Sequence, residues 1–205
     1  MQFDFTTLPA RDRYRLLTNF VGPRPIALVT TRNPDGSNNA APMSFFNVMS
    51  SDPALLMLGI ASKPDQEKDT AANIRRNGTC AIHMVDMDLA DTMLIAGLSV
   101  PNGVDELSLA GVETSECEVI DAPRIAGAAC VFECRVERIL DWPNRVLVIL
   151  EVVRMHVRPD CLDDEGRYVN PETYQPIARL HGDAYITSDR QFELTAPALE
   201  SVFKP

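Results

Sequence analysis

Residues 23–47, PRPIALVTTRNPDGSNNAAPMSFFN, join an ordinary hairpin to a second arm of unusual composition. Residues 26–31 are β-prone and mostly apolar. The run Asn-Pro-Asp-Gly at 33–36 then supplies a turn, because Pro presets φ and Gly accepts positive φ. The returning arm, 37–50, contains Asn residues, small Ala residues, an internal Pro and two adjacent Phe. The stretch therefore predicts a hairpin whose second arm is poorly suited to simple packing.

The second arm has two interpretations. Pro42 cannot donate to a ladder, so it marks a bulge or an edge, and Ala40-Ala41 leave room for a flat molecule beside the backbone. Free peptide groups, the Ser44 hydroxyl and Phe45-Phe46 could then hold a heteroaromatic ring by its edge and face. The alternative is a bulged edge strand whose Phe residues fill the core. On these residues alone we favour the alternative, since most buried aromatic side chains serve packing.

Length, charge and hydropathy limit the classes of protein. A chain of 205 residues fits one domain over 1–205, with a core of about 20–190. A net charge of −10 and a pI near 4.7 oppose binding to nucleic acid or an anionic membrane. The longest apolar run, 54–61, is far below the roughly 20 residues that cross a bilayer. The first residues do not resemble a secretory signal, so we expect a cytoplasmic location.

Cysteine and histidine spacing predicts neither a disulfide framework nor a metal site. The five cysteines form no C-x-x-C pair, as expected in a reducing compartment. Cys130 and Cys134 would lie about 13 Å apart on one strand, too far for a bridge. His83, His156 and His181 have no ligand spacing with each other or with a Cys.

The middle of the chain predicts alternating strands and helices. Residues 54–61 suit a strand buried on both faces, and 69–77 a short helix with Asp69 as N-cap and Gly78 as C-terminal stop. Residues 79–85 read as a strand and 86–98 as a helix with a wide apolar stripe, which could face a partner subunit or a wide core. A polar connector with at most one helical turn follows at 101–118.

The last third predicts a second long hairpin. Residues 128–138 alternate apolar side chains with Glu133 and other charged ones, as a half-solvated antiparallel strand does. A turn at 141–144 leads to a returning arm, 145–157. An acidic loop at 160–165 and a last strand within 180–186 complete the pattern. Strands paired by hairpins predict a mainly β fold, an antiparallel barrel with attached helices. The dinucleotide fingerprint of a parallel fold is absent.

One candidate anion site lies at the start of the predicted helix. A helix N-terminus offers free N–H groups and partial positive charge, to which Lys68 adds a full charge. The hydroxyls of Thr70 and Ser62 could donate to a phosphate. The alternative, an ordinary helix start with a solvated Lys, is the commoner case, and Asp69 would repel phosphate unless it points away.

Classical catalytic groups are not evident elsewhere. No triad spacing or G-x-S-x-G motif occurs, and His83 on its strand suits the core. The segment 179–185 is different, because Arg179, His181 and Tyr185 could form a donor-rich lip beside Gly182. A structural turn is an equal alternative.

Five segments in order resemble the flavin reductase-like proteins, the FMN-binding split barrels. They are PRPIALVTTRNPDGSNNAAPMSFFN, KDTAANIRRNGTCAIHMV, VPNGVDELSLAGVETSE, PRIAGAACVFECRV and NPETYQPIARLHGDAYI, spanning about 23–185. The resemblance implies an antiparallel Greek-key split barrel, a homodimer, and FMN in a groove near the subunit interface.

The resemblance also implies a set of site residues. The isoalloxazine would be lined by Thr30, Thr31, Asn39, Ala40, Ala41, Pro42, Met43, Ser44, Phe45 and Phe46. The phosphate and ribityl end would match Ser62, Lys68, Asp69, Thr70 and Asn73. Arg179, His181 and Tyr185 would approach the flavin or the nicotinamide, with His181 the candidate catalytic residue. In this family the cofactor performs the chemistry, which fits the lack of a triad.

Three functions follow from the resemblance. The first is an NAD(P)H-dependent flavin reductase that supplies reduced FMN to a partner monooxygenase. The second is an FMN-dependent enzyme acting directly on an organic substrate or electron acceptor. The third is a flavin-binding protein without turnover.

Overall fold

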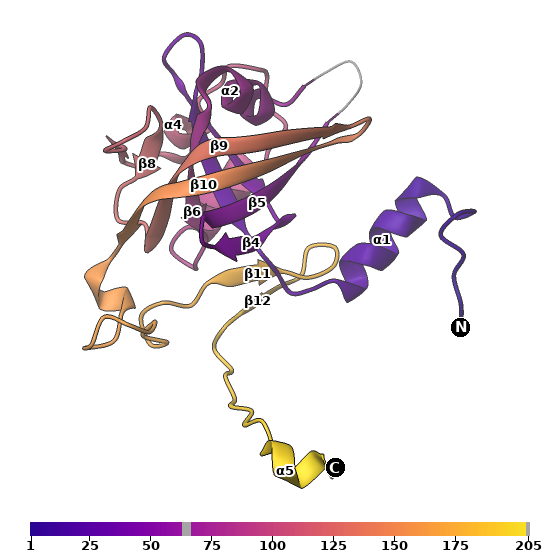
Figure 1. Cartoon of the computed structure of the whole chain (residues 1–205). Helices are drawn as coiled ribbons and strands as arrows, with labels where there is room; N and C mark the ends of the chain where they lie inside the picture. Colours follow the sequence, from indigo (N-terminus) through magenta and orange to yellow (C-terminus); the bar gives the residue numbers. More distant parts are fainter. Residues whose placement is uncertain (63–66, 204–205) are drawn as a thin grey trace.

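The computed structural model describes residues 1–62 and 67–203, and the predicted polar loop at 62–68 lies partly outside this range. Antiparallel sheets with attached helices form the fold, as predicted (Figure 1). The helices are α1 Ala10–Phe20, α2 Asp69–Asn77, α3 Ala90–Ala96, α4 Glu106–Ala110, η1 Pro159–Cys161 and α5 Leu199–Val202. The strands are β1 Arg24–Pro25, β2 Ala27–Arg32, β3 Asn38–Met43, β4 Phe46–Ser51, β5 Ala54–Ala61, β6 Thr79–Met84, β7 Thr114–Glu116, β8 Pro123–Ile125, β9 Cys130–Trp142, β10 Arg145–Val157, β11 Ile177–Arg179 and β12 Tyr185–Thr187.

A seven-stranded sheet forms the body, in the order β3-β2-β6-β9-β10-β5-β4. Its two edge strands, β3 and β4, follow each other in the chain with only Ser44 and Phe45 between them. The sheet therefore curls until its edges meet at these two residues, although no ladder joins β3 to β4. Its inner face carries a core that includes Leu58, Ile82 and Leu150.

The returning arm at 37–50 is two strands, not one. Ala41 of β3 pairs with Val29 of β2, whereas β4 crosses to the far edge, where Phe46 pairs with Leu58 of β5. Pro42 lies on an edge strand, as expected, where its missing N–H breaks no ladder. The packing interpretation holds for the buried Phe46, while Phe45 stays exposed.

The prediction for residues 54–61 is half right. They form β5, but the side chains alternate, so that Leu56 and Leu58 face the core while Met57 is exposed. A continuous apolar run does not distinguish two buried faces from an inner face plus an apolar outer face.

Helix α2 has its predicted bounds and stops at Gly78 with φ 68°. Its N-cap is Lys68, which makes no side-chain cap, so the assignment of Asp69 as N-cap was wrong. Helix α3 is shorter than predicted. Asp86 instead forms a β-bridge with Pro176 and accepts a hydrogen bond from Leu89 N–H at 3.2 Å. The predicted connector at 101–118 contains α4 and β7.

The second hairpin is confirmed, with β9 longer than predicted and β10 as expected. Glu133 is the exception to the predicted alternation, because it is fully buried on the face expected to meet solvent. Its carboxylate accepts hydrogen bonds from the N–H groups of Glu118 and Val119, each at 2.8 Å, and contacts His156 Nε2 at 2.6 Å. Residues 118–119 thus cover this face.

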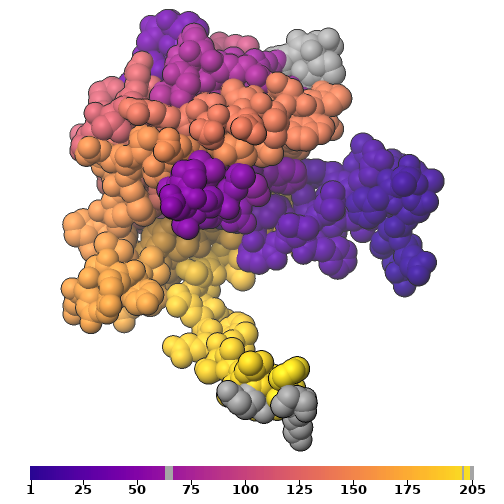
Figure 2. Space-filling model, viewed as in Figure 1, coloured from indigo at the N-terminus to yellow at the C-terminus, as the bar shows by residue number. Residues whose placement is uncertain are grey.

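The predicted last strand at 180–186 is a hairpin. β11 and β12 pair with each other, β1 completes a three-stranded sheet, and His181 and Gly182 lie in the turn. Figure 1 shows α1 to one side of the barrel and α5 at the end of an extended tail, and Figure 2 shows how far the tail projects. Tyr14 of α1 stacks on Phe45 with ring centroids 6.3 Å apart.

Candidate functional site

A cleft of about 430 Å³ opens where edge strand β3, the end of β5 and the start of α2 converge. The segment 96–102, which follows α3, forms the opposite wall. The walls approach closely, since a Cβ added to Gly97 would lie 3.4 Å from Pro42 Cγ. Small residues on both sides therefore set the width of the cleft.

The N-terminus of α2 supplies one end of the cleft. Lys68, Asp69 and Thr70 all line it, together with Ser62, which directly follows β5, and Glu67, whose carboxylate accepts from Arg75 Nε at 2.8 Å. The Asp69 carboxylate accepts a hydrogen bond from Gly103 N–H at 3.2 Å, which engages one oxygen with the opposite wall. This end combines helical N–H groups, one cation and two hydroxyls, the donor set that binds anions.

A buried amide network joins this helix to the hairpin. Asn39 Nδ2 donates to the hydroxyl oxygens of Thr31 and Thr70, each at 3.0 Å. Asn73 Nδ2 donates to Thr31 Oγ1 at 3.0 Å and to Asn33 Oδ1 at 2.7 Å. Thr31 and Asn73 thus do not line the cleft but fix the residues that do.

The outer edge of β3 is already occupied by carboxylates. Glu106 accepts a hydrogen bond from Ala40 N–H at 2.9 Å, and Asp105 one from Asn38 N–H at 3.4 Å. Burial raises the pKa of Glu106, whose side chain lines the cleft. Because Pro42 has no N–H, the expected row of free donors along this strand is reduced. The next polar group is Ser44.

A second hollow of about 240 Å³ adjoins the cleft and shares Pro42, Met43 and Gly97 with it. Ser44, Arg179 and Tyr185 line it as well. The Arg179 guanidinium lies over the Tyr185 ring, 4.7 Å from its centroid, and donates to its hydroxyl. The lip expected from the sequence is therefore built by Arg179 and Tyr185, at the far end of the same groove.

Arg24 is buried and fixes Ser44 in place. Its guanidinium donates to the carbonyl oxygens of Thr18 at 2.7 Å, Val21 at 2.9 Å and Leu180 at 2.8 Å. Its Nε donates to Ser44 Oγ at 3.4 Å, which leaves the Ser44 proton free to donate. One side chain thus connects α1, the closing hairpin and the end of β3.

The cleft and the adjoining hollow bring together most of the residues predicted for cofactor binding. These are Asn39, Ala41, Pro42, Met43, Ser44, Ser62, Lys68, Asp69, Thr70, Arg179 and Tyr185. Thr31, Asn73 and the core residue Ala40 are buried next to the cleft without lining it, and four more predicted residues lie elsewhere. Thr30 is buried with its hydroxyl on Pro123 O at 2.5 Å, Phe46 is in the core, Phe45 is on the flank under Tyr14, and His181 is exposed on the turn.

Sequence reasoning missed three parts of the groove. Glu106, the wall at 96–102 and Arg24 gave no local signal, since a single Glu in a polar connector and an Arg between two Pro residues are unremarkable. His83 is the core histidine that was expected. Its Nδ1 donates to Leu28 O at 3.1 Å and its Nε2 accepts from Ile125 N–H at 2.9 Å, and burial lowers its pKa to about 4.

The groove suits an elongated ligand with an anionic end and a flat end. The anionic end fits Lys68 and the α2 N-terminus, and the flat end fits the part of the cleft beside Ala41 and Met43 of β3. The buried Glu106 carboxyl can accept from a ligand N–H. These features match a flavin mononucleotide, whose phosphate, ribityl chain and planar ring system require such a sequence of environments.

Within the described residues, no group of three or more His, Cys, Asp and Glu side chains is placed to hold a metal ion, and no helix is long and apolar enough to cross a membrane.

Comparison with known proteins gives consistent matches along the chain. The family model described as the flavin reductase like domain matches residues 22–178. The Bacillus subtilis protein YwrF is 34% identical, over 96% of this chain and 98% of that protein. Two solved structures are also similar. Pseudomonas fluorescens 2-nitrobenzoate 2-nitroreductase NbaA has a TM-score of 0.88 at 34% identity, covering 97% of this chain and 98% of that chain. Nitrilotriacetate monooxygenase component B from Bacillus cereus has a TM-score of 0.89 at 32% identity, covering 95% and 98%.

Proposed function

The chain belongs to the flavin reductase-like family of split-barrel flavin oxidoreductases, and from this premise we propose that it binds FMN and reduces it with NAD(P)H. The observation that supports FMN best is the convergence of β3 and the α2 N-terminus on one cleft. Both elements were predicted separately from sequence, and they are far apart in the chain.

The phosphate of FMN belongs at the start of α2. Lys68 contributes a full positive charge and Thr70 a hydroxyl, next to the free N–H groups of the first helical turn. Asp69 is compatible with this role because its carboxylate is engaged by Gly103 N–H. The ribityl chain then passes Ser62 and Asn39.

The ring system belongs between β3 and the segment 96–102. The small side chain of Ala41 leaves space beside β3 for a planar group, and Ser44 can donate to its polar edge. Arg179 and Tyr185 border the adjoining hollow, which is where we place the nicotinamide of the electron donor. We retain His181 as a candidate catalytic residue on the exposed turn beside them.

Bound flavin would supply the electron and hydride transfer, and the protein's residues would bind and orient it. Ser44, oriented by Arg24, donates to the ring edge. The positive Arg179 beside the groove favours negative charge on a reduced ring, which is an electrostatic contribution. No side-chain nucleophile is needed.

Two uses of the reduced flavin remain distinct. The similarity to a monooxygenase component B supports delivery to a partner oxygenase. The similarity to a nitroreductase supports direct action on an organic acceptor. A flavin carrier without turnover is the third possibility. We further propose a homodimer, one domain over 1–205 and a cytoplasmic location.

The absorbance spectrum of the purified protein tests the proposal. We expect a flavin spectrum after loading with FMN, and bleaching on anaerobic addition of NADH or NADPH. Catalytic reduction of excess free FMN without a partner favours the reductase, and turnover of a nitroaromatic acid favours direct action. Binding without bleaching would leave only the carrier, and failure to bind FMN would refute the site.

A further inference from the structure

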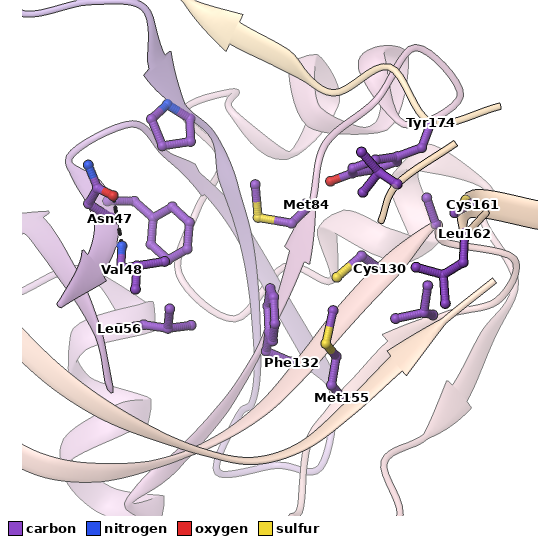
Figure 3. A pocket seen from close by; sticks show the side chains of 15 residues that line it. Asn47, Val48, Leu56, Met84, Cys130, Phe132, Met155, Cys161, Leu162 and Tyr174 are labelled. Atoms are coloured by element: carbon purple, nitrogen blue, oxygen red, sulfur yellow. Dashed lines mark hydrogen bonds between the residues drawn. The ribbon is translucent and has the colours of Figure 1, made fainter. Parts of the chain in front are cut away.

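A second cavity, of about 410 Å³, lies at one end of the barrel. We call it the mouth pocket, and Figure 3 shows it from close by. Phe46, Leu56 and Phe132 reach it from the core side of the sheet, Met155 from β10 and Tyr174 from the segment after η1. The mouth of a β-barrel is a common place for a small-molecule site, and this volume lies in the usual range of about 300–1,000 Å³.

The mouth pocket is separate from the proposed flavin groove. No residue lines both, although two short segments border both cavities. Pro25 and Phe46 line the mouth pocket, whereas Ile26 and Ser44 line the hollow beside the groove. The two cavities thus lie on opposite sides of a common wall.

Among the described residues, the lining carries no charged side chain, in a chain of net charge −10. Its two cysteines, Cys130 and Cys161, are buried. Burial raises the pKa of the Cys130 thiol to about 12, so this group also stays neutral. An ionic ligand would lose its hydration here without a counter-charge, which selects against both cations and anions.

Two polar groups nevertheless face the pocket. The Tyr174 hydroxyl points into the cavity, and it has no hydrogen-bond partner among residues 1–62 and 67–203 (Figure 3). Asn47 at the rim uses its Oδ1 to accept from Val48 N–H at 2.8 Å, so its two amide protons are available. Both groups can donate, and a ligand that accepts a hydrogen bond would satisfy them.

The remaining lining favours a flat, polarisable molecule. Sulfur-bearing side chains come from Met84, Cys130, Met155 and Cys161, and aromatic side chains from Phe46 and Phe132. Thioether and aromatic groups both make favourable contacts with aromatic rings. Met side chains also adapt to ligands of different outline.

We propose that the mouth pocket is a second binding site, for a neutral aromatic compound that carries a carbonyl or similar acceptor toward Tyr174. The site is independent of the flavin groove and needs no redox step.

Binding of three naphthalene probes to the flavin-free and the FMN-saturated protein tests this. The neutral ketone 2-acetonaphthone should bind once per chain in both forms. The anion 2-naphthoate should bind at least tenfold more weakly. The Tyr174→Phe variant should bind the ketone about three- to tenfold more weakly, the size of one lost hydrogen bond, but bind 2-ethylnaphthalene as before. Tyr168→Phe, a control at an exposed tyrosine outside the pocket, should change neither.

A blocking variant gives a second test. Val169 lies at the rim and is 52% exposed, so Val169→Trp should close the pocket without disturbing the core. It should abolish binding of both neutral probes and leave FMN binding unchanged. Displacement of the ketone by FMN, equal binding of the anion, an unaffected Tyr174→Phe variant or the absence of saturable binding would each overturn the proposal. If the wild-type protein does not bind FMN, the proposed function is refuted, but the proposal for the mouth pocket is not.

Discussion

The Glu106 carboxylate accepts a hydrogen bond from Ala40 N–H at 2.9 Å, so that helix α4 covers the outer edge of β3. An uncovered edge strand invites pairing with another chain, and a carboxylate on its N–H prevents this. The same contact puts a buried acid into the wall of the proposed flavin groove. We therefore expect both stability and ligand binding to depend on this one side chain.

Replacing Glu106 tests its role in stability. Glu106→Ala leaves Ala40 N–H without its acceptor, and we expect a loss of about 1–3 kcal/mol in the free energy of unfolding. Glu106→Gln keeps an acceptor oxygen and should lose far less. Urea denaturation of both variants measures the difference, and equal losses would show that the hydrogen bond is not what matters.

The pH dependence of Glu106→Gln has a definite sign. Burial raises the folded pKa of Glu106, so its favourable contribution is complete below the unfolded pKa near 4.5 and is lost as pH rises through the folded value. The Gln variant has no such loss. Relative to wild type it should be more stable at pH 7 than at pH 4, and a constant difference across this range would contradict the assignment.

Local signals were enough to predict the elements that later form the groove. Gly78 ended α2 where expected, and Pro42 marked an edge. Glu133 was misplaced because alternation along one strand contains no information about residues 118–119, which cover it. The arm at 37–50 was read as one strand because only the tertiary pairing of Phe46 with Leu58 moves β4 to the far edge. Glu106 and Arg24 were missed for the same reason, since Ala40 is distant in sequence from Glu106, and Leu180 and Ser44 are distant from Arg24.

Blocking the groove should remove flavin without unfolding the barrel. Ala41→Leu fills the space beside β3, and Gly97→Leu fills it from the opposite wall. We expect each variant to weaken FMN binding at least tenfold, as measured by titration of flavin fluorescence, with an unchanged circular dichroism spectrum. Ala54→Leu, at an exposed position of β5, is the matched control and should bind normally. Normal affinity in both groove variants would move FMN elsewhere.

The phosphate end can be tested with a ligand that lacks phosphate. Lys68→Gln removes the one cation in the described lining of the cleft. A charge-assisted contact is worth roughly 1.5–3 kcal/mol, so FMN affinity should fall about tenfold or more. Riboflavin has the same ring and ribityl chain without the phosphate, and its affinity should not change. If both ligands weaken equally, Lys68 acts on the ring or on the fold instead.

His83 should make the protein lose stability in mild acid. It is buried and neutral, with one ring nitrogen donating to Leu28 O and the other accepting from Ile125 N–H. A second ring proton would break the hydrogen bond from Ile125 N–H in the folded state. Its folded pKa of about 4 lies below the unfolded value of 6.5, and the stabilisation present above pH 6.5 is lost as pH falls toward 4. The full difference corresponds to roughly 3 kcal/mol.

The variant His83→Gln measures this loss directly. Gln offers one donor and one acceptor but takes up no proton, so its free energy of unfolding should fall less than that of wild type between pH 6.5 and 4. His181→Gln, at the exposed turn, is the control and should follow the wild-type curve. Groups that titrate in the same range are common to all three proteins and cancel in the comparison. Parallel curves for His83→Gln and wild type would show that the buried imidazole is not the source of the acid sensitivity.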